Sequence, residues 1–109
     1  MTVAALWIRI KLMKPFQWSA EKNHQLKHDR GISFERVTVA VESGGLLDVV
    51  SHPNPTKYPN QRVLIVAIDA YAFLVPFVDE PEHYFLKTII PSRKATREYL
   101  RKDTPDHEN

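Results

Sequence analysis

The second half of the chain contains four short apolar runs separated by turn residues, and this pattern limits the fold more than any other feature of the sequence. The runs are rich in Val, Ile, Leu, Phe and Tyr, and they cover residues 46–50, 62–69, 71–78 and 83–91. Such runs between clusters of Pro, Asn and Asp are typical of an antiparallel meander. Residues 63–68 are apolar at every position, which predicts a strand covered on both faces. Asp69-Ala70 predicts a tight hairpin, and Pro76, which has no N–H, predicts a bulge or an open edge.

Helical patterns stand on both sides of these strands. Ser19 is a suitable N-cap for a helix over residues 20–30 that ends at Gly31. Ser33 is a suitable N-cap for a second helix over residues 34–42, with a strand as the alternative because of the β-branched residues there. A third helix is expected after Ser92, running to about residue 102. The sequence therefore predicts an α+β fold with two N-terminal helices, a four-stranded antiparallel meander sheet and a C-terminal helix, preceded by a short extended piece at residues 16–18.

Length and composition restrict the chain to one globular domain. The chain has 109 residues, of which 43% are hydrophobic and 26% charged, and a domain takes about 100–200 residues. We place the domain at residues 13–102, because Met13-Lys14-Pro15 reads like a second beginning. Residues 1–12 are then an N-terminal extension or, as the alternative, an extra edge strand. Residues 103–109 are expected to be a flexible acidic tail.

The sequence points to a cytoplasmic protein without a membrane partner. No apolar run approaches the roughly 18 residues that cross a bilayer, and no basic region precedes the first apolar run as a secretory signal requires. The chain has no cysteine, which excludes disulfides, thiolate metal sites and cysteine nucleophiles and fits a reducing compartment.

Positive charge is segregated rather than abundant. The formal net charge is only +2, from 15 Lys and Arg against 13 Asp and Glu. Basic residues nevertheless gather on the first helix, on the last strand and on the last helix, namely Lys22, Lys27, Arg30, Lys87, Arg93, Lys94, Arg97 and Arg101. Phosphate binding needs such an asymmetry, because each neutralised phosphate releases counterions. A solvated helix face, or a patch complementary to an acidic partner protein, remains the alternative.

Several side chains are candidates for acid and base chemistry on RNA. Cleavage without a metal needs a base for the 2′-hydroxyl proton, a donor for the leaving oxygen and cations for the phosphorane charge. The candidates are His24, His28, His52, His83, Glu98 and Tyr99. His24 and His28 have a spacing that suits zinc, but no third ligand is evident, and no glycine loop is followed by the Lys-Ser/Thr pair of a P-loop. We therefore expect no metal and no cofactor.

Two motifs carry a resemblance to a known family. Phe16-Gln17-Trp18-Ser19-Ala20-Glu21-Lys22-Asn23 with Arg30-Gly31-Ile32-Ser33-Phe34-Glu35 resembles the opening motif of the BrnT toxins, and Lys87-Thr88-Ile89-Ile90-Pro91-Ser92-Arg93-Lys94-Ala95-Thr96-Arg97-Glu98-Tyr99 resembles their closing motif. The match spans residues 13–102. It implies a RelE-like ribonuclease toxin of a type II toxin-antitoxin system. It further implies metal-independent RNA cleavage and a small DNA-binding antitoxin as partner, with a homodimer and a hetero-oligomer both open.

The resemblance points to particular site residues. Motif matches fall on Lys22, Asn23, Arg93, Lys94, Ala95, Glu98 and Tyr99. We expect Arg93 and Arg97, with Arg62 as a third, to hold the scissile phosphate. Glu98 or His28 is the expected base, and Tyr99 a structural or donating group. The expected RNA-binding residues are Lys22, Lys27, Arg30, Arg62, Lys87, Lys94 and Arg101, converging with the catalytic group around one concavity. The rival hypothesis is a non-catalytic basic module that binds an antitoxin-like partner.

Overall fold

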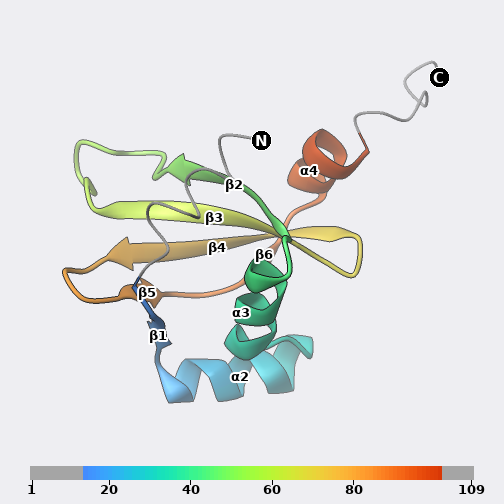
Figure 1. Cartoon of the computed structure of the whole chain (residues 1–109), viewed down its shortest axis with the longest axis horizontal. Coiled ribbons are helices and arrows are strands. Elements are labelled where there is room, and N and C mark those ends of the chain that lie inside the picture. The colour runs from blue at the N-terminus through green and yellow to red at the C-terminus, as the bar shows by residue number, and fades with distance from the viewer. Residues whose placement is uncertain (1–13, 102–109) are drawn as a thin grey trace.

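The elements follow the order that the sequence predicts. A computed structural model describes residues 14–101 (Figure 1). It contains β1 (Phe16–Trp18), α2 (Ala20–Arg30), α3 (Phe34–Glu42), β2 (Leu46–Ser51), β3 (Gln61–Ile68), β4 (Tyr71–Asp79), β5 (Tyr84–Leu86), β6 (Ile90–Pro91), α4 (Arg93–Ala95) and a π-helical turn, η1 (Thr96–Leu100). The predicted extension or edge strand over residues 1–12 and the predicted acidic tail over residues 103–109 lie outside the described residues.

Serine caps begin the helices at the predicted positions. The Ser19 and Ser33 side chains each accept a hydrogen bond from a backbone N–H three residues on, both at 3.1 Å. Gly31 ends α2 with φ 67°, in the left-handed region that favours glycine. Both N-terminal helices therefore have the predicted bounds. The longest of them, α2, has 11 residues, and no helix within residues 14–101 is long and apolar enough to cross a membrane.

The sheet contains the predicted meander but is larger and mixed. Its strand order is β1-β5-β4-β3-β2, and β6 pairs with β4. Strands β2 to β5 are antiparallel neighbours, as predicted, whereas β1 pairs with β5 in parallel. The predicted run 83–91 is divided into β5 and β6. The β4–β5 pairing ends at Phe77 and Leu86, beside Pro76, which accepts a bond from the Lys87 N–H but has no N–H to return.

The turn between β3 and β4 is the predicted tight hairpin. Ile68 pairs with Tyr71 across it. The two intervening residues, Asp69 and Ala70, have φ 55° and 64°. Two positive φ values in a two-residue loop are typical of the type I′ turn, whose twist matches that of the flanking strands.

Strand β3 separates two hydrophobic clusters. Leu64, Val66 and Ile68 belong to the larger cluster, which includes Phe34 of α3 and Leu26 of α2. Ile65 belongs to a smaller cluster with residues of the C-terminal segment. Successive strand residues point to opposite faces, so β3 is covered on both faces, as predicted. It follows that α2 and α3 pack on one face of the sheet and the C-terminal helical segment on the other (Figure 1).

Candidate nucleic-acid interface

The C-terminal helical segment is fixed to β4 by one buried polar side chain. Thr96 is 1% exposed. Its Oγ1 accepts a hydrogen bond from the Ala72 N–H at 2.8 Å and donates to the Ser92 carbonyl at 2.8 Å. The Ser92 N–H donates in turn to the Ala72 carbonyl at 3.0 Å. Both backbone groups of Ala72 are therefore satisfied by this segment, which sets its position on the sheet.

A second contact fixes the far end of this segment. The Tyr99 hydroxyl donates to Asp48 Oδ2 at 2.6 Å. A register shift in β2 between Leu46 and Asp48 lets both Leu47 and Asp48 face the C-terminal segment, since a β-bulge re-aims side chains. The hydrogen bond to Asp48, helped by burial, raises the pKa of Tyr99 to about 12. The Tyr99 hydroxyl is thus engaged with β2.

The opposite side of the segment carries exposed positive charge. We call Arg93, Lys94, Arg97 and Arg101 the C-terminal cationic face. All four side chains are exposed, as is Glu98. Among residues 14–101, the first three make no ion pair. The predicted continuous helix is wrong in detail, because regular α-helix covers only residues 93–95 and Arg97 and Glu98 lie in the π-helical turn. Such turns are rare and often occur at functional sites.

Lys22 and Lys27 of α2 lie away from this face. Lys27 and His28 are exposed on α2 and Lys22 is half-buried, and α2 packs on the other side of the sheet. The His28 ring lies 3.0 Å from Asp29, and both side chains are largely exposed. The expectation that the two basic groups converge around one concavity is wrong for Lys22 and Lys27, because charge along a helix does not reveal which sheet face the helix covers. Within residues 14–101, no cluster of three His, Asp or Glu side chains is placed to hold a metal.

Asn23, which the motif resemblance singled out, joins the two N-terminal helices. It is 5% exposed. Its side-chain oxygen accepts a hydrogen bond from the Phe34 N–H at 2.8 Å, and its amide donates to Glu35 Oε1 at 2.8 Å. The bond from Asn23 lowers the pKa of Glu35. One of the N–H groups that α3 leaves without a helical partner is thereby satisfied, which makes Asn23 a structural residue.

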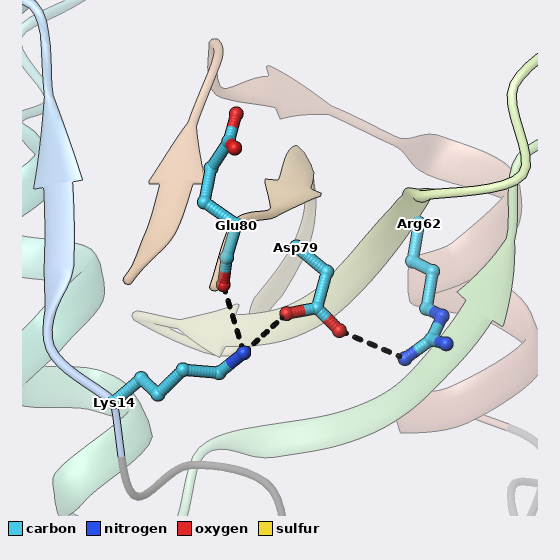
Figure 2. Close-up of polar contacts among 4 residues, drawn as sticks. All are labelled: Lys14, Arg62, Asp79 and Glu80. Atoms are coloured by element: carbon cyan, nitrogen blue, oxygen red, sulfur yellow. Dashed lines mark hydrogen bonds and ion pairs between the residues drawn. The ribbon is translucent and has the colours of Figure 1, made fainter. Parts of the chain in front are cut away.

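Arg62 belongs to an ion-pair network rather than to the cationic face. Asp79 accepts from Lys14 Nζ at 2.7 Å and faces Arg62 Nη1 at 3.7 Å, while Lys14 also donates to the Glu80 carbonyl at 2.8 Å (Figure 2). Arg62 is two residues from Leu64 and so shares the sheet face covered by α2 and α3. The structure therefore does not bring Arg62 to Arg93 and Arg97. Lys87 is exposed just beyond β5.

The structure also forms a cleft that the sequence did not indicate. The cleft has a volume of ≈ 560 Å³ and lies where the α2–α3 turn meets the β3–β4 hairpin. Arg30, Arg36, Tyr71, Phe73 and Pro91 are among its lining residues. We call it the hairpin cleft. Arg30 is the one predicted RNA-binding residue of α2 that reaches the edge where the C-terminal segment begins, because its Nη1 donates to the Ile89 carbonyl at 2.7 Å.

The chain matches no protein-family model, no curated protein and no solved structure. Functional assignment therefore depends on the geometry of the site and on the motifs in the sequence.

Proposed function

We propose that this chain is a RelE-like endoribonuclease, the toxin of a type II toxin-antitoxin pair, and that the C-terminal cationic face binds its RNA substrate in the cytoplasm. The observation that carries the proposal is the exposure of Arg93, Lys94 and Arg97 without an acidic partner among residues 14–101. Thr96 and Tyr99 hold the segment that bears them. Cations that are already positioned stabilise developing charge without reorganisation. The BrnT resemblance of the same residues supports this interpretation.

The proposed reaction needs no metal. Arg93 and Arg97 bind the non-bridging oxygens of the scissile phosphate, and Lys94 binds a neighbouring phosphate. Glu98 takes the proton of the 2′-hydroxyl, and the 2′-oxygen attacks phosphorus. The bond to the 5′-oxygen breaks, and that oxygen takes a proton from water. The products are a 2′,3′-cyclic phosphate and a 5′-hydroxyl.

This assignment narrows the candidates for acid and base. His28 lies on α2, on the other side of the sheet, so Glu98 is the proposed base. The Tyr99 hydroxyl is engaged with Asp48, and its raised pKa of about 12 makes it a poor proton donor near neutral pH. Tyr99 therefore acts in the proposal by holding the segment in place.

A second function is favoured by the same observations. With Tyr99 engaged and His28 distant, Glu98 is the one predicted acid-base group left on the cationic face. A surface of this kind also suits a non-catalytic module that receives an acidic antitoxin-like protein. In the toxin proposal, such an antitoxin inhibits by covering the face that binds RNA.

One experiment separates the two functions. Labelled RNA is incubated in EDTA with the full chain, with Arg93→Ala and with Lys57→Ala, a control that removes the same charge at an exposed position in the loop between β2 and β3. The toxin proposal expects cleavage by the wild type and the control and loss of cleavage in Arg93→Ala. If the RNA stays intact at high wild-type concentration, the enzyme proposal is wrong. Tight binding of an acidic partner then supports the interaction module.

A further inference from the structure

We infer that the hairpin cleft binds one nucleotide of an RNA strand that also crosses the C-terminal cationic face. This inference rests on the proposed RNA-binding function and adds a second subsite to it. The inference depends on one arrangement. The guanidinium groups of Arg30 and Arg36 line the same open cleft as the aromatic rings of Tyr71 and Phe73.

The cleft has the size of a ligand site. Its volume is ≈ 560 Å³, within the range of about 300–1,000 Å³ that small-molecule sites occupy. Three segments far apart in the sequence build it: residues 30–36 around the α2–α3 turn, the β3–β4 hairpin and Pro91 of β6. Since the hairpin is a two-residue turn between paired strands, the aromatic wall is held by regular structure.

The two arginines are oriented but retain donors. Arg30 uses Nη1 for the Ile89 carbonyl at 2.7 Å, and Arg36 uses Nη2 for Asp69 Oδ1 at 2.8 Å. A guanidinium has five N–H donors, so others remain for phosphate oxygens. The Arg36 and Asp69 side chains are 49% and 78% exposed. Exposed ion pairs are weak, and a phosphate can take the place of Asp69 at little cost.

The aromatic wall suits a base. Tyr71 and Phe73 are two residues apart on one face of β4, with ring centroids 5.8 Å apart and planes at 67°. Both side chains are half-buried, which fixes the rings while leaving part of them accessible. Bases stack on such rings whatever their identity, because every base has a π-face.

The cleft adjoins the cationic face along the chain. Pro91 lines the cleft and pairs with Phe73 through β6. Arg93, the first cation of that face, follows two residues later. Phe73 lies on the sheet face that α2 and α3 cover, so a strand bound at Arg93 passes around β6 at the edge of the sheet to meet the arginines of the cleft. This continuity favours a nucleotide over the alternative occupant, an acidic peptide.

The test uses the full chain labelled with ¹⁵N and titrated with adenosine 5′-monophosphate or ribose 5-phosphate. We expect adenosine monophosphate to shift the amide signals of Gly31, Arg36 and Tyr71, and ribose 5-phosphate to bind about tenfold more weakly because it has no base to stack. No shift at these amides with millimolar adenosine monophosphate would overturn the inference, and so would equal affinity for the two probes. Stronger displacement of the same signals by an oligoglutamate peptide would replace the nucleotide with a peptide partner.

Two variants that each remove one positive charge test whether nucleotide binding depends on the cleft or on the overall charge of the protein. Arg36→Gln is compared with Lys57→Gln, which removes the same charge in the loop at the other end of β3. We expect the first to weaken adenosine monophosphate binding about tenfold, as a lost charge-assisted bond requires, and the second to leave it unchanged. Equal weakening by both variants contradicts the cleft. Tyr71→Leu removes the ring and retains both arginines. Unchanged affinity of this variant for adenosine monophosphate would contradict stacking of the base on Tyr71.

Cleavage assays distinguish this inference from the proposed function. If the chain binds adenosine monophosphate in the cleft but never cuts RNA, the nuclease proposal is wrong and the nucleotide site stands. If it cuts RNA while Arg36→Gln leaves KM and kcat unchanged and no cleft signals shift, the nuclease stands and the cleft inference is wrong.

Discussion

Helix α2 and the C-terminal helical segment are built alike and differ in their charge. Each is mostly polar and each docks through one buried polar side chain, Asn23 in α2 and Thr96 in the C-terminal segment. In α2, three Lys and Arg residues alternate with two carboxylates, whereas the C-terminal segment carries four against Glu98 alone. The excess of basic over acidic residues is therefore one in α2 (three minus two) and three in the C-terminal segment (four minus one). This excess, more than the number of basic residues, distinguishes the two surfaces.

The docking contacts differ in a second way. Asn23 connects α2 to the start of α3, so it stabilises one helix against another. Thr96 connects its segment to the backbone of β4, so it holds a cationic surface directly on the sheet. A rigid support suits a site that must hold a phosphate in place, which is why we assign the RNA site to the C-terminal segment and a mainly structural role to α2.

The largest expected effect compares the two basic groups directly. We expect the double variant Arg93→Ala/Arg97→Ala to lower RNA cleavage about 100-fold or more, as loss of positioned transition-state donors does. We expect Lys22→Ala/Lys27→Ala to change it little. The slope of log affinity against log salt concentration should become less steep by about 1.4 in Arg93→Ala/Arg97→Ala, because two phosphate contacts on a single strand are lost. Gel-shift titration measures RNA affinity, and cleavage assays measure the rate. An equal loss of RNA cleavage in the two double variants would contradict the comparison.

The next effect tests the docking of α2. Asn23→Ala should lower the free energy of unfolding by about 3 kcal/mol, because the buried Phe34 N–H loses its acceptor and Glu35 loses a donor. Urea denaturation followed by circular dichroism measures this. Asn60→Ala, an exposed loop position, is the matched control and should stay within about 0.5 kcal/mol. A change in Asn23→Ala no larger than in the control would show that the contact between helices is dispensable.

The helices and the hairpin could be predicted from the sequence because their signals are local. Ser19, Ser33 and Gly31 act within one turn of the residues they cap, and Asp69-Ala70 joins two strands that are neighbours in the chain. The parallel pairing of β1 with β5 could not be predicted, because three residues give no measurable periodicity and their partner lies more than 60 residues away.

The site was harder to predict than the fold. The basic side of the C-terminal segment followed from its spacing, and the structure keeps those residues exposed. Asn23 and Asp48 form contacts across the fold that sequence periodicity cannot indicate, and the Asp48 contact depends on a bulge. The hairpin cleft forms where three separate segments meet, so no single stretch of sequence predicts it.

A smaller effect tests the docking of the C-terminal segment. Thr96→Val retains the shape of the side chain but removes the hydroxyl, which leaves the Ala72 N–H without its acceptor. We expect a loss of about 2 kcal/mol in the free energy of unfolding. If Thr96 positions the cationic face, kcat for RNA cleavage should also fall while Thr96→Ser, which keeps the hydroxyl, restores it. Lower stability with unchanged kcat would confine Thr96 to a purely structural role.

The smallest effect concerns Tyr99 and depends on pH. The Tyr99→Phe variant loses the hydrogen bond to Asp48, and we expect a loss of about 1 kcal/mol at neutral pH. The pKa of Tyr99 is raised from 10.0 in its ordinary state to about 12 in the folded protein, so folding favours the protonated phenol. The stabilisation is therefore complete below pH 10 and disappears as the pH rises through about 12.

Urea denaturation of wild type and Tyr99→Phe at several pH values should show two stabilities that differ at pH 8 and approach each other across this window. Tyr58→Phe, in the loop between β2 and β3, controls for general alkaline effects. A difference between wild type and Tyr99→Phe that stayed constant to the alkaline limit would mean that Asp48 does not hold the Tyr99 proton, and the far end of the cationic face would then rest on apolar packing alone.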